Sequence, residues 1–197
     1  MKPEEYKDIT NFLFEIGTLR KIPRFHRQTL LTDDLSDTIS SHTYRVTWIG
    51  WFLAKIEKVD PYKVVMMCLV HDMPEARSND HNWIHKRYIK IFEDEIRADQ
   101  LGKLPFDDLE NIASEYDERE SAESKVAKEA DLLDQILLLR EYEWQGNKEA
   151  NRWLYGPNGE HLQIEKMKTT VGRELAEMFY TCNPSDWWKG LHTSVNR

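Results

Sequence analysis

The sequence predicts an all-α protein, and three observations support this fold class. Apolar residues recur at the three- and four-residue spacing of amphipathic helices along most of the 197-residue chain. No alternating run of apolar and polar residues is long enough to predict a β-strand. Most glycines and prolines fall between the helical patterns, where they separate one helix from the next.

The predicted helices follow one another with short connections. In order, we expect them near residues 3–19, 36–58, 60–72, 82–101, 105–118, 121–144 and 160–180. Pro3 suits the first turn of the first helix, and Asp60-Pro61 pairs an N-cap residue with proline in the first turn of the third. Pro74 ends that helix because it cannot donate a backbone hydrogen bond. The turn sequence at residues 155–159 precedes the last helix.

The chain has no internal repeat, low-complexity tract or obvious linker, so we expect one domain over residues 1–197. A domain of this length can bury a full core without metal or disulfide support. Any metal site is therefore a candidate for chemistry rather than for folding.

Charge and composition exclude several classes of protein. A formal net charge of −8 and a pI of about 5.4 argue against binding to a nucleic-acid polymer, which requires a basic surface. The most apolar runs, 46–54 and 64–70, are far shorter than the roughly 20 residues of a membrane-spanning helix. Two widely separated cysteines and an acidic N-terminus without a signal-peptide pattern predict a soluble, cytoplasmic protein.

Histidine and aspartate residues at three places suggest a metal site. His71-Asp72 ends an apolar helix, although such a pair alone is more often a buried couple whose members satisfy each other's hydrogen bonds. His42 lies upstream, and Asp131 and Asp134 lie downstream inside an apolar helix, where an unpaired charge is costly. Two imidazoles and two carboxylates suit Mn²⁺, Fe²⁺, Co²⁺, Ni²⁺ or Zn²⁺.

These residues resemble the signature of HD-domain metal-dependent phosphohydrolases: a histidine, then His-Asp, then a distant aspartate. The resemblance extends from about residue 12 to 144 and is strongest to the small 5′-deoxynucleotidases. It implies a helical bundle with the metal site in its centre and further helices at about residues 160–190. The metal ligands that it implies are His42, His71, Asp72 and Asp131.

The fourth ligand depends on the resemblance alone. Helical periodicity does not distinguish Asp131 from Asp134, and the apolar stripe places Asp134 nearer the edge of the core. The resemblance selects Asp131, because Lys128 to Asp134 match the setting of the family's aspartate ligand. Asp134 is the second candidate.

The resemblance also implies catalytic and substrate-binding residues. Residues 19–25 match a family motif in which an arginine followed by an aromatic residue holds the nucleotide, here Arg24 and Phe25. Glu75 would assist catalysis beside the metal, and Asp80 would lie near the sugar and leaving group, although a solvated helix end is the simpler interpretation of Asp80. Arg45 could bind phosphate or pair with a carboxylate such as Glu75.

Arg20 and Arg27 are weaker candidates for a phosphate contact, since most arginines are surface residues.

The predicted activity is hydrolysis of deoxyribonucleoside 5′-monophosphates to deoxynucleoside and phosphate. One alternative is a deoxynucleoside triphosphate triphosphohydrolase with the same metal centre. Another is a noncatalytic nucleotide-sensing HD domain, against which the full ligand set and Glu75 argue. Relatives of this kind and the abundance of aromatic residues predict a homodimer.

Overall fold

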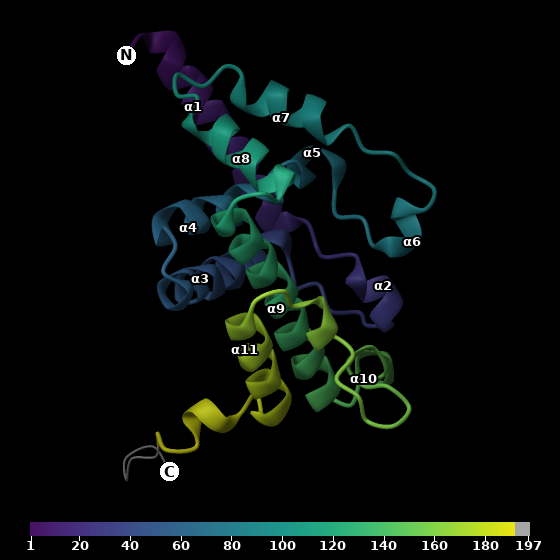
Figure 1. Cartoon of the computed structure of the whole chain (residues 1–197). Helices are drawn as coiled ribbons and strands as arrows, with labels where there is room; N and C mark the ends of the chain where they lie inside the picture. The colour runs from purple at the N-terminus through teal and green to yellow at the C-terminus, as the bar shows by residue number, and fades with distance from the viewer. Residues whose placement is uncertain (192–197) are drawn as a thin grey trace. The chain divides into compact units, whose positions relative to one another are not determined.

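The computed structural model describes residues 1–191, which form helices joined by loops (Figure 1). These residues contain no β-strand and only two isolated bridges, Pro23 with Thr38 and Tyr155 with His161. The all-α fold class is therefore confirmed. No helix in this part of the chain combines the length and the apolar character needed to cross a membrane.

The chain divides into two compact units, Met1–Asp131 and Leu132–Arg197. The prediction of one domain over residues 1–197 stays a prediction. All predicted site residues except Asp134 lie in the first unit.

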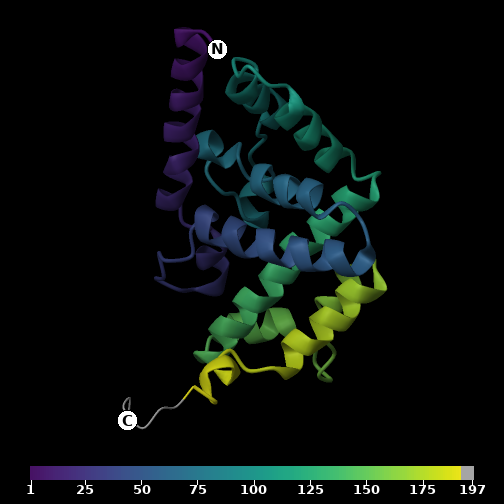
Figure 2. The same cartoon turned by 90° about the vertical axis from the view of Figure 1, so that its left-hand side faces the viewer.

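The centre of the first unit consists of α3 (Ile39–Glu57) packed against α4 (Pro61–Val70), with α8 (Asp108–Glu118) on α4 (Figure 2). α4 begins at Pro61, as the Asp60-Pro61 pair predicts, whereas α3 begins three residues after its predicted start at residue 36. The Thr38 side chain accepts the backbone N–H of Ser41, and Asp60 accepts the N–H groups of Tyr62 and Lys63. The packed faces bury apolar side chains, among them Ile39, Val46, Leu53, Val64 and Met67.

The N-terminal segment is shorter in α-helix than predicted. The first helix, α1 (Pro3–Ile16), is followed by a 3-10 turn, η1 (Gly17–Lys21). Glycine favours this end because it has low helix propensity. A short helix that the sequence analysis missed, α2 (His26–Leu30), then precedes α3.

The continuous helix predicted over residues 82–101 is wrong. The structure has α5 (Glu75–Ser78), a one-turn α6 (Trp83–Lys86) and, after a non-helical stretch, α7 (Glu93–Leu101). The β-branched Ile89 and Ile91 disfavour helix in that stretch. Three acidic residues at 93–95 instead favour a new helix start, where the helix dipole is positive.

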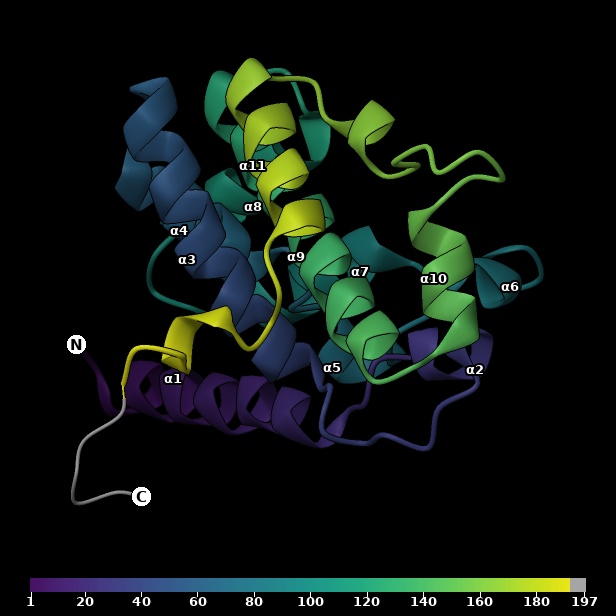
Figure 3. The same ribbon diagram turned by 90° about the horizontal axis from the view of Figure 1, so that it is seen from below.

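The second unit contains the C-terminal half of α9 (Ala122–Trp144), α10 (Lys148–Leu154) and α11 (Thr170–Thr181) (Figure 3). α10 was not predicted. The helix predicted from residue 160 starts only at Thr170, because Thr169 caps it by accepting the N–H of Gly172. The Arg140 side chain joins elements of this unit by donating to the carbonyl oxygens of Phe179 and Cys182 at 3.1 and 3.2 Å.

Candidate metal centre

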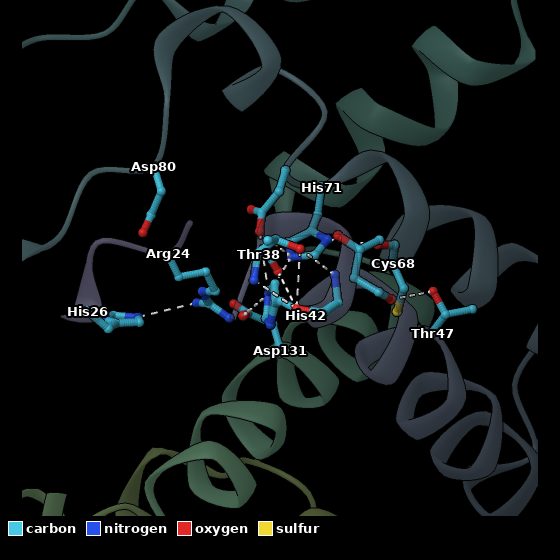
Figure 4. A network of polar contacts seen from close by, with 12 residues as sticks. Arg24, His26, Thr38, His42, Thr47, Cys68, His71, Asp80 and Asp131 are labelled. Atoms are coloured by element: carbon cyan, nitrogen blue, oxygen red, sulfur yellow. Dashed lines mark hydrogen bonds and ion pairs between the residues drawn. The ribbon is translucent and has the colours of Figure 1, made fainter. Parts of the chain in front are cut away.

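Three of the predicted ligands meet where α3 begins and α4 ends (Figure 4). His42 lies in the first turn of α3, and His71 and Asp72 follow the last residue of α4. The Nε2 atoms of His42 and His71 are 3.3 Å apart. Asp72 Oδ2 lies 3.4 Å from His42 Nε2 and 3.1 Å from His71 Nε2. One donor atom from each residue falls within 4.8 Å of the others.

A backbone carbonyl fixes the orientation of His71. Its Nδ1 lies 2.7 Å from the carbonyl oxygen of Cys68, one turn earlier in α4. A carbonyl can only accept a hydrogen bond, so Nδ1 is the donor, which selects the tautomer whose Nε2 lone pair faces His42 and Asp72. That tautomer is the one that a metal ligand requires.

The geometry of these donors fits a divalent cation. Lone pairs at 3.1–3.4 Å repel one another unless a proton or a cation lies between them. Burial alone would raise the pKa of Asp72, but the interactions with His71 and His42 outweigh burial and hold it well below its usual range. Asp72 is therefore a carboxylate, as a metal ligand must be.

Asp131 approaches the cluster from α9. One carboxylate oxygen lies 3.4 Å from His42 Nε2, and the other accepts from Lys128 Nζ at 2.6 Å. Burial would raise the pKa of Asp131, but the hydrogen bond from His42 and the charge of Lys128 hold it well below its usual range. Asp134 is fully buried and belongs to the second unit. The choice of Asp131 as fourth ligand remains a prediction.

Glu75 follows the cluster in α5. The backbone keeps helical geometry past Pro74, since Glu75 N–H donates to Asp72 O at 3.0 Å, and Arg77 N–H donates to Pro74 O at 3.0 Å. Glu75 Oε2 is buried and has no hydrogen-bond partner. Burial, together with the charges of Asp72 and Asp80, raises the pKa of Glu75 to about 9. The group can therefore hold a proton at neutral pH.

Arg24 lies between His26 and the ligand cluster (Figure 4). Its backbone N–H donates to Asp37 O at 2.8 Å, and the bridge of Pro23 with Thr38 holds the segment beside the start of α3. The buried guanidinium lies 3.2 Å from His26 Nε2. Burial and the charge of Arg24 lower the pKa of His26 to about 4, so a neutral ring accepts this hydrogen bond.

Asp80 contacts the backbone at Phe25, in the segment that resembles the family's substrate motif. It is buried and accepts the N–H of Phe25. The fully buried Asn82 adds two bonds, donating to the Phe25 carbonyl at 3.0 Å and to Gln28 Oε1 at 2.8 Å. The loop before α6 therefore holds residues 25–28 in place.

No motif in the sequence marks His26 or Asn82 as a site residue. The helix-capping position of Asn82 can be read from the sequence, but its bond to a residue 57 positions earlier cannot.

The other candidate arginines for a phosphate contact are Arg45, Arg20 and Arg27. Arg45 is half-buried on α3, three residues after His42 and so on a neighbouring position of the same helix face. Arg20 is exposed in η1, and Arg27 lies 4.0 Å from Asp33. Of the arginine candidates, Arg24 is the one that Figure 4 places beside the metal-ligand cluster.

Comparisons with known proteins agree with this arrangement. A family model described as HD domain matches residues 16–168. The 5′-deoxynucleotidase HDDC2 of Bos taurus is 30% identical over 151 residues, which cover 72% of this chain and 71% of the bovine protein. A conserved hypothetical protein from Pyrococcus furiosus has a similar structure, with a TM-score of 0.70, 25% identity and coverage of 88% of this chain and 99% of that one.

A second solved structure shows the same fold at lower identity. This protein from Magnetospirillum magnetotacticum, described as a predicted metal-dependent phosphohydrolase, is 23% identical, with a TM-score of 0.66 and coverage of 90% of this chain and 92% of that one.

Proposed function

The chain belongs to the HD-domain family and is a hydrolase, and from this premise we propose that it removes phosphate from deoxyribonucleoside 5′-monophosphates. One observation carries the proposal: two imidazole nitrogens and a carboxylate converge beside a buried arginine and a carboxyl group that can hold a proton. The named activity of the bovine relative supports the choice of substrate.

In this proposal His42, His71, Asp72 and Asp131 hold one divalent metal. Their nitrogen and oxygen donors suit Mn²⁺, Fe²⁺, Co²⁺, Ni²⁺ or Zn²⁺. Such a metal, when bound, neutralises phosphate charge and lowers the pKa of water.

Arg24 binds the phosphate group. A guanidinium can donate to two phosphate oxygens at once, and burial strengthens these bonds by removing competing water. His26 orients the guanidinium through its contact with Nη2, and as a neutral ring it adds no repulsion. Arg45 is a second candidate contact on the adjacent helix face.

Glu75 transfers the proton. Its raised pKa favours the protonated form, which can donate to the 5′-oxygen as the P–O bond breaks. Water bonds to phosphorus as the P–O bond breaks, and the Glu75 carboxylate takes up the proton that this water loses, so that the products are deoxynucleoside and inorganic phosphate and Glu75 is protonated again. Phe25 borders the sugar and base, and Asp80 positions Phe25 through its backbone N–H.

We also propose a homodimer. The apolar side chains Trp48, Phe52 and Ile56 follow one face of α3 at four-residue spacing and are each more than half exposed. Light scattering at micromolar concentrations should give twice the monomer mass, and a monomer mass throughout would contradict this proposal.

The substrate is tested by stripping the purified protein of metal and reloading it with each of the five candidates. We expect phosphate release from deoxyribonucleoside monophosphates with at least one metal. Triphosphate release from deoxynucleoside triphosphates, without action on monophosphates, would favour the triphosphohydrolase. Nucleotide binding without turnover under every metal would favour a sensor.

A further inference from the structure

α5 is the element that carries Glu75, and it is too short to hold its own position. It consists of four residues, Glu75–Ser78, and begins directly after Pro74. A helix of one turn has little stability by itself, so its position depends on contacts with other elements. Polar contacts of this kind come from α1 and α7 (Figure 1).

The Arg77 side chain joins α5 to both α1 and α7. Its Nε and Nη2 atoms donate to the two carboxylate oxygens of Glu15 at 2.6 and 3.0 Å, the bidentate geometry that makes an arginine–carboxylate pair strong and directional. Its Nη1 donates to Asp99 Oδ2 at 3.3 Å. The hydrogen bond from Arg77 outweighs burial and lowers the pKa of Glu15, so Glu15 is ionised at neutral pH.

Gln100 connects the same carboxylate to the backbone between Asp72 and Glu75. It is 4% exposed, and its Nε2 donates to Glu15 Oε1 at 2.7 Å and to the Met73 carbonyl at 3.2 Å. Both partners can only accept, which fixes the orientation of the amide. Gln100 therefore holds the backbone that links a predicted metal ligand to the proposed proton donor.

The second atom of this amide argues for a role other than stability. Gln100 Oε1 is buried and has no hydrogen-bond partner among residues 1–191. An unsatisfied buried acceptor is destabilising, so an apolar side chain of similar length would suit this position better if packing alone mattered. The amide instead supplies two N–H groups, which reach Met73 directly and Arg77 through Glu15.

We propose that Gln100, Glu15 and Arg77 are positioning residues, which hold α5, and with it the carboxyl group of Glu75, in place at the metal centre. This inference rests on the proposed function. None of the three is a predicted metal ligand or substrate contact, so they act through the backbone of α5. Proton transfer requires the acid within hydrogen-bond reach of the leaving oxygen, and a displacement of about 1 Å can lower the rate about a hundredfold.

Gln100→Met separates positioning from stability. Methionine has a similar length and no acceptor to leave unsatisfied, while the Met73 carbonyl and the Glu15 carboxylate each keep another donor. The melting temperature should therefore stay equal or rise. Hydrogen exchange at the amides of residues 75–79, followed by mass spectrometry on the metal-free protein, should nevertheless become about threefold to fivefold faster, as expected for the loss of one hydrogen bond.

Glu15→Gln tests the ion pair, and the chain contains a matched control for it. Lys63 Nζ lies 2.6 Å from Glu115 Oε2 and joins α4 to α8. The exposures of these two side chains, 36% and 27%, are close to the 37% and 25% of the Arg77–Glu15 pair. Glu115→Gln should lower the melting temperature about as much as Glu15→Gln does, without faster exchange at residues 75–79.

Steady-state kinetics give a second readout. In Gln100→Met and Glu15→Gln, kcat for a deoxynucleoside monophosphate should fall about tenfold. KM should change by less than about threefold, because Arg24 and Phe25 keep their own hydrogen bonds. Metal content should stay unchanged, and Glu115→Gln should keep the kcat of the wild type.

The two measurements distinguish this inference from the proposed function. Unchanged exchange at residues 75–79 in both variants would overturn the inference and leave the hydrolase activity intact. An equal loss of kcat in Glu115→Gln would also overturn it, because the loss would then follow stability alone. A wild type that hydrolyses no deoxynucleotide with any metal would contradict the proposed function, while faster exchange in both variants would still support the positioning of α5.

Discussion

At the scale of single residues, two side chains of the candidate metal centre, His71 and Asp131, depend on a neighbour that sets their protonation. Cys68 O directs the proton of His71 to Nδ1, and Lys128 and His42 keep Asp131 ionised. These neighbours prepare donors of the correct form before any metal arrives.

Removal of a ligand should therefore separate metal binding from folding. Asp72→Ala should lose metal and turnover, while circular dichroism shows a largely helical protein, because the site is not needed to complete the core. Metal content measured by emission spectrometry provides the readout. Wild-type activity in this variant would remove Asp72 from the ligand set.

The fourth ligand can be decided by a matched pair of variants. Asp131→Asn should lower metal affinity much more than Asp134→Asn, since an Asp131 carboxylate oxygen lies 3.4 Å from the His42 Nε2 that faces the other ligands. Both changes replace a carboxylate with a neutral amide of similar shape, so competition titration with a chelator compares them directly. The reverse order would transfer the role to Asp134.

Glu75 makes stability depend on pH when metal is chelated. Its folded pKa of about 9 exceeds the ordinary value of 4.5, so between these values the folded protein holds a proton that the unfolded chain has released. The stabilisation by this proton is complete below pH 4.5 and is lost as pH rises through 9. The melting temperature of Glu75→Gln minus that of the wild type should therefore increase from pH 5 to pH 8.5. A constant difference would show that Glu75 is ionised throughout.

At the scale of elements, long helices could be predicted from the sequence and short ones could not. α3, α4, α8 and α9 have several turns of apolar periodicity, so they were found with small errors at their ends. α2 and α6 have five and four residues, too few to show a period. Their structure depends on contacts such as Asn82 with Phe25, which joins residues 57 apart.

The same contrast between sequence patterns and long-range contacts explains which candidate site residues could be predicted from the sequence. His42, His71, Asp72 and Asp131 form a pattern of residue types that resembles a known family, and the structure brings them close together. Asn82 has no such pattern, because its role is to hold the backbone of another segment.

Asn82 should behave as a positioning residue for that segment. Asn82→Ala removes its bonds to Phe25 and Gln28, so residues 24–28 should move relative to the metal ligands. We expect KM for a deoxynucleoside monophosphate to rise by about tenfold, because Arg24 would hold the phosphate less well, with metal content unchanged. Steady-state kinetics with metal analysis would check this, and an unchanged KM would contradict it.

At the scale of the whole molecule, α9 connects the two compact units without a break and also carries Asp131. A continuous helix transmits unfolding from one unit to the other, since breaking it exposes several backbone hydrogen bonds at once. One cooperative transition is therefore expected in calorimetry, with equal calorimetric and van't Hoff enthalpies. Two resolved transitions would contradict the prediction of one domain.

The hydrogen bond from His71 to Cys68 also bears on how the sequence can change over time. A partner that is a side chain can be lost by one mutation, whereas a backbone carbonyl is present whatever residue occupies position 68. Selection at this position therefore acts on volume: a Cβ at Gly50 would lie only 2.6 Å from Cys68 Sγ. Alanine or serine could replace Cys68 without misaligning the ligand, while a larger residue would require a concerted change nearby. Mutation of residue 68 therefore leaves the hydrogen bond that orients His71 in place.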